Sequence, residues 1–155
     1  MGAASCGDDG AASSSVAAPF GVCLDDAANQ LYVLEGGCSR VRRIDLSAAT
    51  IATVVGTGVS GSTFSPDPLA AQLSRPSGCA LLAYDDGLNP TTLFFTDHDN
   101  GHVLAYYPAN DTLAVVTDGL TLPAALAIDR TNHLLYVVER GTAMVSAIHA
   151  VQLPR

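Results

Sequence analysis

The densest cluster of polar side chains in the sequence lies at positions 97–103, which read DHDNGHV. His98 and His102 carry imidazole nitrogens and Asp99 a carboxylate, all of which are groups that divalent metals accept as ligands. Their spacing has no special metal geometry, and they fall on an expected turn rather than on a rigid strand. Asp and Asn are also ordinary turn residues. His98, Asp99 and His102 are therefore candidate metal ligands, while a structural turn is the favoured interpretation.

Nucleophilic and nucleotide chemistry find no support in the motifs of the chain. The sequence has no Gly-x-Ser-x-Gly elbow and no reactive-cysteine signature. The glycine-rich stretch at 56–58 lacks the Lys of a phosphate-binding loop. We therefore predict no catalytic residue and no cofactor, with Ca²⁺ or Zn²⁺ as the alternative for a metal-dependent enzyme.

A glycosylation sequon, Asn110-Asp111-Thr112, stands on an expected turn, where an acceptor asparagine is exposed. Together with the cysteines, it favours an extracellular or cell-surface location. The N-terminus has Asp8 and Asp9 where a signal peptide needs a basic start and an apolar middle, so no targeting signal is read there.

The four cysteines show no CxxC pair and no metal-ligand spacing with the histidines; they are Cys6, Cys23, Cys38 and Cys79. Four cysteines allow three disulfide connectivities, and the sequence does not choose among them. Cys23 and Cys79 lie in apolar strand patterns. The favoured interpretation is that they are buried small hydrophobic residues, with disulfides as the alternative.

The elements that must position these residues come from a pattern that the chain repeats three times. LYVLE at 31–35, LFFTD at 93–97 and LYVVE at 135–139 each hold four strand-forming residues followed by a carboxylate. Ten residues after each leading Leu stands a valine, namely Val41, Val103 and Val145. A proline precedes an apolar strand upstream of each block, at Pro19, Pro76 and Pro123.

Each repeat predicts short antiparallel strands joined by polar turns, four in the first two repeats and three in the last. A sheet of this size has free edges and an apolar face, which the next sheet of a radial array covers. The apolar second strands fit burial between neighbouring sheets, and Phe94 and Tyr136 are expected there. The sequence therefore predicts an all-β fold made of four-stranded β-propeller blades, with three repeats visible. A two-sheet sandwich explains the strand spacing but not the threefold register.

The repeats resemble the NHL-repeat family, whose pattern runs Pro-x-Gly-apolar, then Leu-Tyr-Val-x-Asp, then x-x-Asn-x-Arg before Ile or Val. The resemblance covers 19–149. The second repeat matches most closely, with His102 where the family usually has Arg. The first keeps Arg40 but has Cys38 in place of Asn, and the third keeps only the carboxylate and the valine. Six-bladed propellers similar to this family include calcium-dependent lactonases and zinc-dependent lyases, whose sites lie at the central axis.

The carboxylate that ends each second strand has a physical role in this pattern. We expect it to accept backbone N–H groups from the tight turn that follows, with Arg40 or His102 packing back across that turn. Five residues are therefore predicted to be structural residues of these turns: Glu35, Arg40, Asp97, Asn100 and Glu139.

The repeats divide the chain into a flexible or edge-strand N-terminal segment, 1–18, and a propeller portion, 19–155. Within the propeller portion, the blades are expected at about 19–58, 76–119 and 123–151. An inserted linker, 59–75, separates the first two blades and holds the one helical candidate, Asp67–Leu73, which Pro68 opens.

The formal charge of −8 argues against a nucleic-acid partner, because affinity for a phosphate backbone depends on clustered Lys and Arg. No apolar stretch approaches the ~20 residues of a membrane-spanning helix, so no membrane insertion is expected.

These observations favour a non-catalytic protein-interaction or assembly module, built from NHL-type blades and part of a larger chain or oligomer. The alternative is a portion of a metal-dependent six-bladed propeller hydrolase or lyase. Because known propellers close with about four to eight blades, the expected partners are other proteins or copies of this chain. In a pair of copies, the segment Ser13–Ala17 of one copy is expected to complete the third blade of the other.

Overall fold

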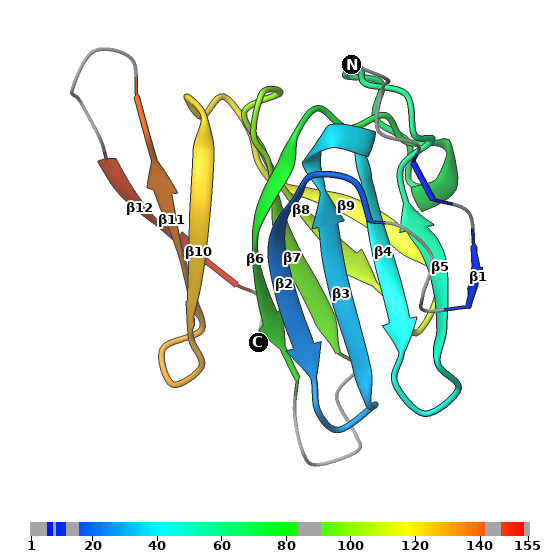
Figure 1. Ribbon diagram of the computed structural model, residues 1–155. Coiled ribbons are helices and arrows are strands. Elements are labelled where there is room, and N and C mark those ends of the chain that lie inside the picture. The colour runs from blue at the N-terminus through cyan, green and yellow to red at the C-terminus, as the bar shows by residue number, and fades with distance from the viewer. Residues whose placement is uncertain (1–5, 8, 12–15, 84–90, 142–146, 154–155) are drawn as a thin grey trace.

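The computed structural model describes residues 6–7, 9–11, 16–83, 91–141 and 147–153, and these form antiparallel sheets that stack side by side (Figure 1). The first sheet, blade 1, holds β2 (Pro19–Asp25), β3 (Gln30–Glu35), β4 (Arg40–Asp45) and β5 (Thr50–Val55). Neighbouring strands are consecutive in the chain, as in a meander. The predicted all-β fold of propeller blades is confirmed.

The other two sheets repeat this order. Blade 2 holds β6 (Pro76–Leu82), β7 (Thr92–Asp97), β8 (His102–Tyr107) and β9 (Thr112–Thr117). Blade 3 consists, among the described residues, of β10 (Pro123–Asp129), β11 (Leu134–Glu139) and β12 (Ala147–Gln152). Val145, the repeat valine of blade 3, lies outside the described residues.

The N-terminal segment adds a fifth strand to blade 1. β1 (Gly10–Ala11) pairs antiparallel with β5, with Gly10 opposite Ile51. Of the segment expected to cross to a second copy, residues 13–15 lie outside the described residues, and the backbone N–H of Ala17 bonds to Glu35 within its own blade. The edge of β5 is therefore partly covered by the chain's own N-terminal segment.

The helical candidate at 67–73 is only a 3₁₀ turn, η2 (Pro68–Ala70). The Asp67 carboxylate accepts the N–H of Leu69 at 3.1 Å, as a helix cap does. The backbone returns to an extended conformation at Ala71, so the helix ends after one turn. A second 3₁₀ turn, η1 (Gly36–Cys38), follows β3. None of the described helices is long and apolar enough to cross a membrane.

The core lies between the blades, because alternate residues of each second strand point to opposite faces of the sheet. Between blades 1 and 2, Tyr32 and Leu34 share a buried cluster with Leu93 and Phe95. Between blades 2 and 3, the cluster contains Phe94, Leu135 and Val137. The middle blade is thus covered on both faces.

The expectation for Tyr136 is corrected by this arrangement. Phe94 is 4% exposed, but Tyr136, at the same position of the next repeat, is 37% exposed. Leu135 and Val137 point toward blade 2, so Tyr136 must point to the other face of blade 3, which no described residues cover with a further blade.

The favoured interpretation of the cysteines is also corrected, because all four form disulfides: Cys6 with Cys38, and Cys23 with Cys79. Cys23 lies on β2 and Cys79 on β6, with Cα atoms 6.3 Å apart. The close approach of these first strands brings the two sulfur atoms together. This bond links blade 1 to blade 2, and the other ties the N-terminal segment to η1.

Replacing both Cys23 and Cys79 by Ser is expected to lower the free energy of unfolding by about 2–4 kcal/mol, since the crosslink restricts the unfolded chain. Chemical denaturation of the variant and of the unmodified chain measures this difference. Replacing Cys6 and Cys38 instead serves as the comparison that leaves the link between the blades intact. An unchanged midpoint for the first variant would contradict the prediction.

Candidate binding pocket at the first strands

The first strands of the three blades lie next to one another, with β6 packed between β2 and β10. Gly21 and Gly78 make this approach close: a Cβ on Gly21 would overlap the carbonyl oxygen of Ser77, and one on Gly78 that of Ala124. The Pro-x-Gly pattern of the first two repeats is explained by this contact between blades. Ala125 takes the glycine's place in blade 3.

A hydroxyl group on β7 joins two of these strands, β6 and β10. The Thr96 Oγ1 atom accepts the backbone N–H of Gly78 at 2.8 Å and lies 3.2 Å from the carbonyl oxygen of Ala124. Thr96 is fully buried, and its hydroxyl provides a hydrogen-bond partner for backbone groups of β6 and β10. It fixes the distance between β6 and β10.

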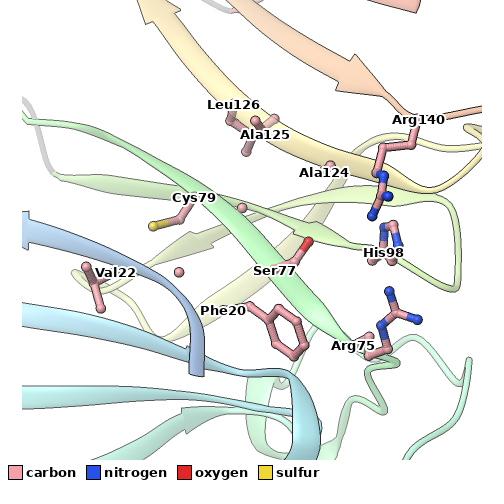
Figure 2. Close-up of a pocket in the computed structure, with 12 residues that line it drawn as sticks. Phe20, Val22, Arg75, Ser77, Cys79, His98, Ala124, Ala125, Leu126 and Arg140 are labelled. Atoms are coloured by element: carbon pink, nitrogen blue, oxygen red, sulfur yellow. The ribbon is translucent and has the colours of Figure 1, made fainter. Parts of the chain in front are cut away.

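A pocket of about 410 Å³ opens beside these strands (Figure 2). Phe20, Val22 and Leu126 provide its apolar surface, and Arg75, His98 and Arg140 its charged and polar surface. Among the residues that the structure describes, no Asp or Glu lines it. The volume lies within the range of about 300–1,000 Å³ that is typical of small-molecule sites.

His98 sits on the turn after β7 and is only 4% exposed. Its Nδ1 atom lies 3.0 Å from the carbonyl oxygen of Pro123, and because a carbonyl only accepts, Nδ1 carries the hydrogen. Burial lowers the pKa of His98, and the cations of Arg75 and Arg140 lower it further. His98 is therefore neutral at neutral pH and points toward blade 3.

Arg75 and Arg140 place their guanidinium groups on either side of His98 (Figure 2). Arg75 immediately precedes the proline that opens blade 2, and Arg140 immediately follows the carboxylate that ends β11. Arg75 Nη1 lies 3.4 Å from Asp99 Oδ1, with both side chains partly exposed. Sequence reasoning did not select either arginine, because only the stacking of blades 2 and 3 brings them to one place.

The three metal-ligand candidates point to different partners. His98 bonds to Pro123, whereas Asp99 pairs with Arg75. His102 stands directly opposite Asp97 in the pairing of β7 with β8. Within the described ranges, no group of three or more His, Cys, Asp or Glu side chains is placed to hold a metal ion.

The three repeat carboxylates accept backbone N–H groups from residues upstream of the first strand, whereas the donors were expected in the turn that follows the second strand. Each accepts the N–H of the residue two positions before the proline of its blade: Glu35 from Ala17, Asp97 from Ser74, and Glu139 from Thr121. Sheet register is the reason, since each carboxylate residue pairs directly with that proline. The residue between donor and proline has a positive φ in every case: Ala18, Arg75 and Leu122.

The second partner of the carboxylate differs from blade to blade. In blade 2, the Asn100 amide donates to Asp97 at 2.7 Å. In blade 3, His149 Nε2 lies 2.6 Å from Glu139. Burial raises the pKa of Asp97 to about 6, whereas the bond from His149 lowers the pKa of Glu139. Of these two carboxylates, Asp97 is the more buried and is harder to ionise than Glu139.

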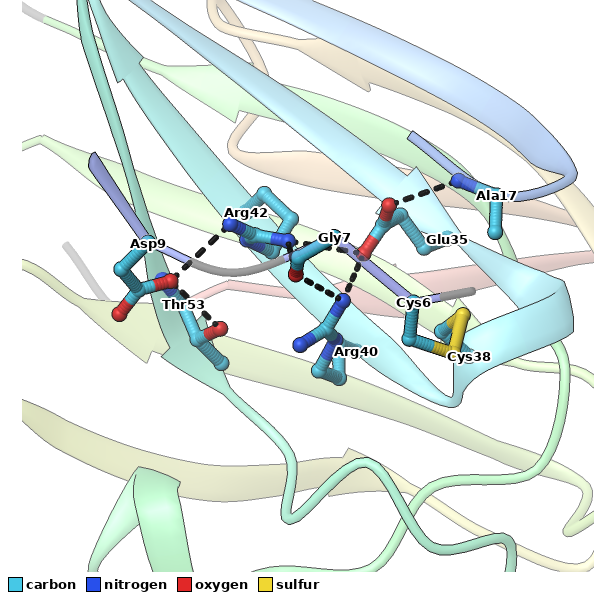
Figure 3. Close-up of polar contacts among 9 residues, drawn as sticks. All are labelled: Cys6, Gly7, Asp9, Ala17, Glu35, Cys38, Arg40, Arg42 and Thr53. Carbon is cyan, nitrogen blue, oxygen red and sulfur yellow. Dashed lines mark hydrogen bonds and ion pairs between the residues drawn. A yellow bond between two sulfur atoms is a disulfide. The ribbon is translucent and has the colours of Figure 1, made fainter. Parts of the chain in front are cut away.

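In blade 1 the carboxylate belongs to a buried ionic network (Figure 3). Glu35 pairs with Arg40 at 3.0 Å and with Arg42 at 3.4 Å, and the side chains of Glu35 and Arg42 are fully buried. Arg42 also donates to the Gly7 carbonyl oxygen at 2.9 Å and pairs with Asp9 at 3.0 Å. The N-terminal segment therefore supplies part of the charge balance of blade 1, which sequence reasoning missed.

Asn110 lies exposed on the turn between β8 and β9. Its side-chain oxygen accepts a hydrogen bond from the Thr112 hydroxyl at 2.8 Å. Glycosylation at this position stays a prediction.

No protein-family model and no curated protein matches the sequence. Solved structures are similar in fold. An auxiliary nutrient binding protein from Bacteroides thetaiotaomicron superposes with a TM-score of 0.68 at 13% identity, over 86% of this chain and 37% of that one. An auxiliary nutrient binding protein from Bacteroides ovatus gives 0.64 at 16% identity, over 76% and 34% of the two chains.

A chain of a nidogen/laminin complex is also similar, with a TM-score of 0.65 at 19% identity. The match covers 87% of this chain and 44% of that chain. The chain thus spans less than half of the length of each of these structures. At such identities the similarity shows the fold, and the fold is that of propeller blades.

Proposed function

We propose that this chain is a non-catalytic binding and assembly module, formed by NHL-type propeller blades that belong to a larger ring. The proposal assigns no catalytic residue and no cofactor to it. Its partners are further blades, from a second copy or from a longer polypeptide, and proteins or ligands that bind the faces of the ring.

The observation that carries this proposal is the uncovered face of blade 3. Phe94, on the matching face of blade 2, is buried under Leu135 and Val137. On blade 3 the same face carries Tyr136, 37% exposed, and Ile148, 72% exposed. An exposed apolar sheet face of this kind is typical of an interaction site. A blade with apolar residues at the positions of Leu135 and Val137 would cover it.

Two further observations support the proposed location and the proposed binding role. The two disulfides favour an extracellular or cell-surface location, because such bonds persist in oxidising compartments. Two of the similar structures are auxiliary nutrient binding proteins, which supports a binding role for blades of this shape.

Sedimentation velocity of the 155-residue chain tests the assembly. We expect concentration-dependent association that Ile148→Asp weakens, since the substitution places a charge on the uncovered face. Val59→Asp is the matched control, because Val59 is also an exposed apolar residue, 60% exposed, but lies in the linker between blades 1 and 2. A monodisperse monomer at all concentrations would overturn the assembly proposal, as would equal effects of the two substitutions.

A further inference from the structure

The pocket beside the first strands combines two cations with an apolar wall in a strongly acidic protein. We propose that this pocket binds a carboxylate attached to an apolar or aromatic group, with the carboxylate held by Arg75 and Arg140 beside His98. The inference rests on the proposed binding function and names the chemical class of ligand for one site on the blades.

The charge distribution is the first argument. The chain has a formal charge of −8, yet two of its seven arginines line this one pocket, and none of the acidic residues that the structure describes does. Both cations lie close enough to His98 to lower its pKa, so their fields overlap there. An anion that contacts both guanidinium groups would be attracted by both positive charges.

The state of Arg75 is the second argument. Its carboxylate neighbour, Asp99, is 3.4 Å away, which is longer than the 2.7–2.9 Å typical of charge-assisted hydrogen bonds. A guanidinium group has five N–H donors in a planar fork that fits a carboxylate with two bonds. Arg75 can therefore keep Asp99 as a neighbour and still donate to a ligand.

The apolar wall determines the rest of the ligand. Phe20 and Val22 are 59% and 62% exposed although both stand on a strand of a packed sheet, and they face the pocket together with Leu126. An aromatic or aliphatic group that covers them would remove apolar surface from water. Two kinds of molecule carry such a carboxylate: a free organic acid, and a polypeptide at its C-terminal residue.

Isothermal titration with 3-phenylpropionate tests the inference, and its neutral analogue 3-phenylpropanamide is the ligand control. We expect the acid to bind and the amide to bind at least about tenfold more weakly. Arg75→Gln and Arg140→Gln should each weaken binding of the acid by about tenfold or more. Asp99→Asn should strengthen it, because it removes the carboxylate that competes for Arg75.

The matched protein control is Arg130→Gln. It changes the net charge equally, but Arg130 follows Asp129 at the opposite end of β10, away from this pocket. Binding should be unchanged in this variant. A peptide that ends in Phe with a free carboxylate, compared with the same peptide amidated, separates the two sources. Circular dichroism of each variant checks that the blades are intact.

The outcomes are distinguishable from those of the assembly test. If the chain associates in sedimentation but the acid and the free-carboxylate peptide both fail to bind, the pocket inference is wrong and the proposed function stands. Equal binding of acid and amide, or equal effects of Arg130→Gln and Arg75→Gln, would also overturn it. If Arg75→Gln unfolds the chain, two other variants still test the inference. Arg140→Gln should weaken binding of the acid, and Asp99→Asn should strengthen it.

Discussion

Phe94→Ala is expected to lower the free energy of unfolding by about 3–5 kcal/mol, because the side chain fills the core between blades 2 and 3 and its removal leaves a cavity. Phe94 is 4% exposed and packs in the cluster that contains Leu135 and Val137. Urea denaturation at low protein concentration, where association is minimal, measures the effect.

Tyr136→Ala is the control at the same position of the next repeat, and it should cost roughly 1 kcal/mol or less under those conditions. Tyr136 lies on the uncovered face of blade 3, so its loss creates no cavity within the chain. At concentrations where the chain associates, the cost of Tyr136→Ala should rise, because binding stabilises the folded state. Equal costs for the two substitutions at low concentration would show that the faces of the blades are assigned wrongly.

The second large effect is expected from Glu35→Gln, which should lower the free energy of unfolding by about 3 kcal/mol or more. The substitution keeps the shape of the side chain but removes the charge that faces two arginines, one of them, Arg42, fully buried. A buried cation that loses a carboxylate partner cannot recover that energy from water. Thermal and urea unfolding of the variant measure the loss.

Glu139→Gln is the matched control, since Glu139 has the same place in blade 3 but pairs with His149, whose side chain is 42% exposed. Its effect should be clearly smaller. The double variant Glu35→Gln with Arg42→Met should be less destabilised than Glu35→Gln alone, because no buried cation then faces the neutral side chain. A double variant as unstable as the sum of its parts would show that the charge balance is not the cause.

The sequence alone determined the repeat, and with it the fold. The blocks LYVLE, LFFTD and LYVVE became β3, β7 and β11, and the prolines at 19, 76 and 123 open β2, β6 and β10. Strand periodicity, turn residues and the spacing between them are local properties, so they are visible in a linear sequence. The carboxylates at the ends of the second strands were also visible, but the sequence did not indicate that they accept N–H groups from residues upstream of the first strands.

Only the tertiary structure shows which segments meet between the blades. The pairing of Cys23 with Cys79, the burial of Phe94 against the exposure of Tyr136, and the convergence of Arg75, His98 and Arg140 all arise from blade stacking. The Glu35–Arg42 network likewise needs a return of the N-terminal segment to blade 1. These contacts join residues that are far apart in the chain. In the sequence, matching positions of the three repeats look alike. A position gains its burial or its charge partners from the neighbouring blade, so equivalent residues acquire different roles only once the blades are stacked.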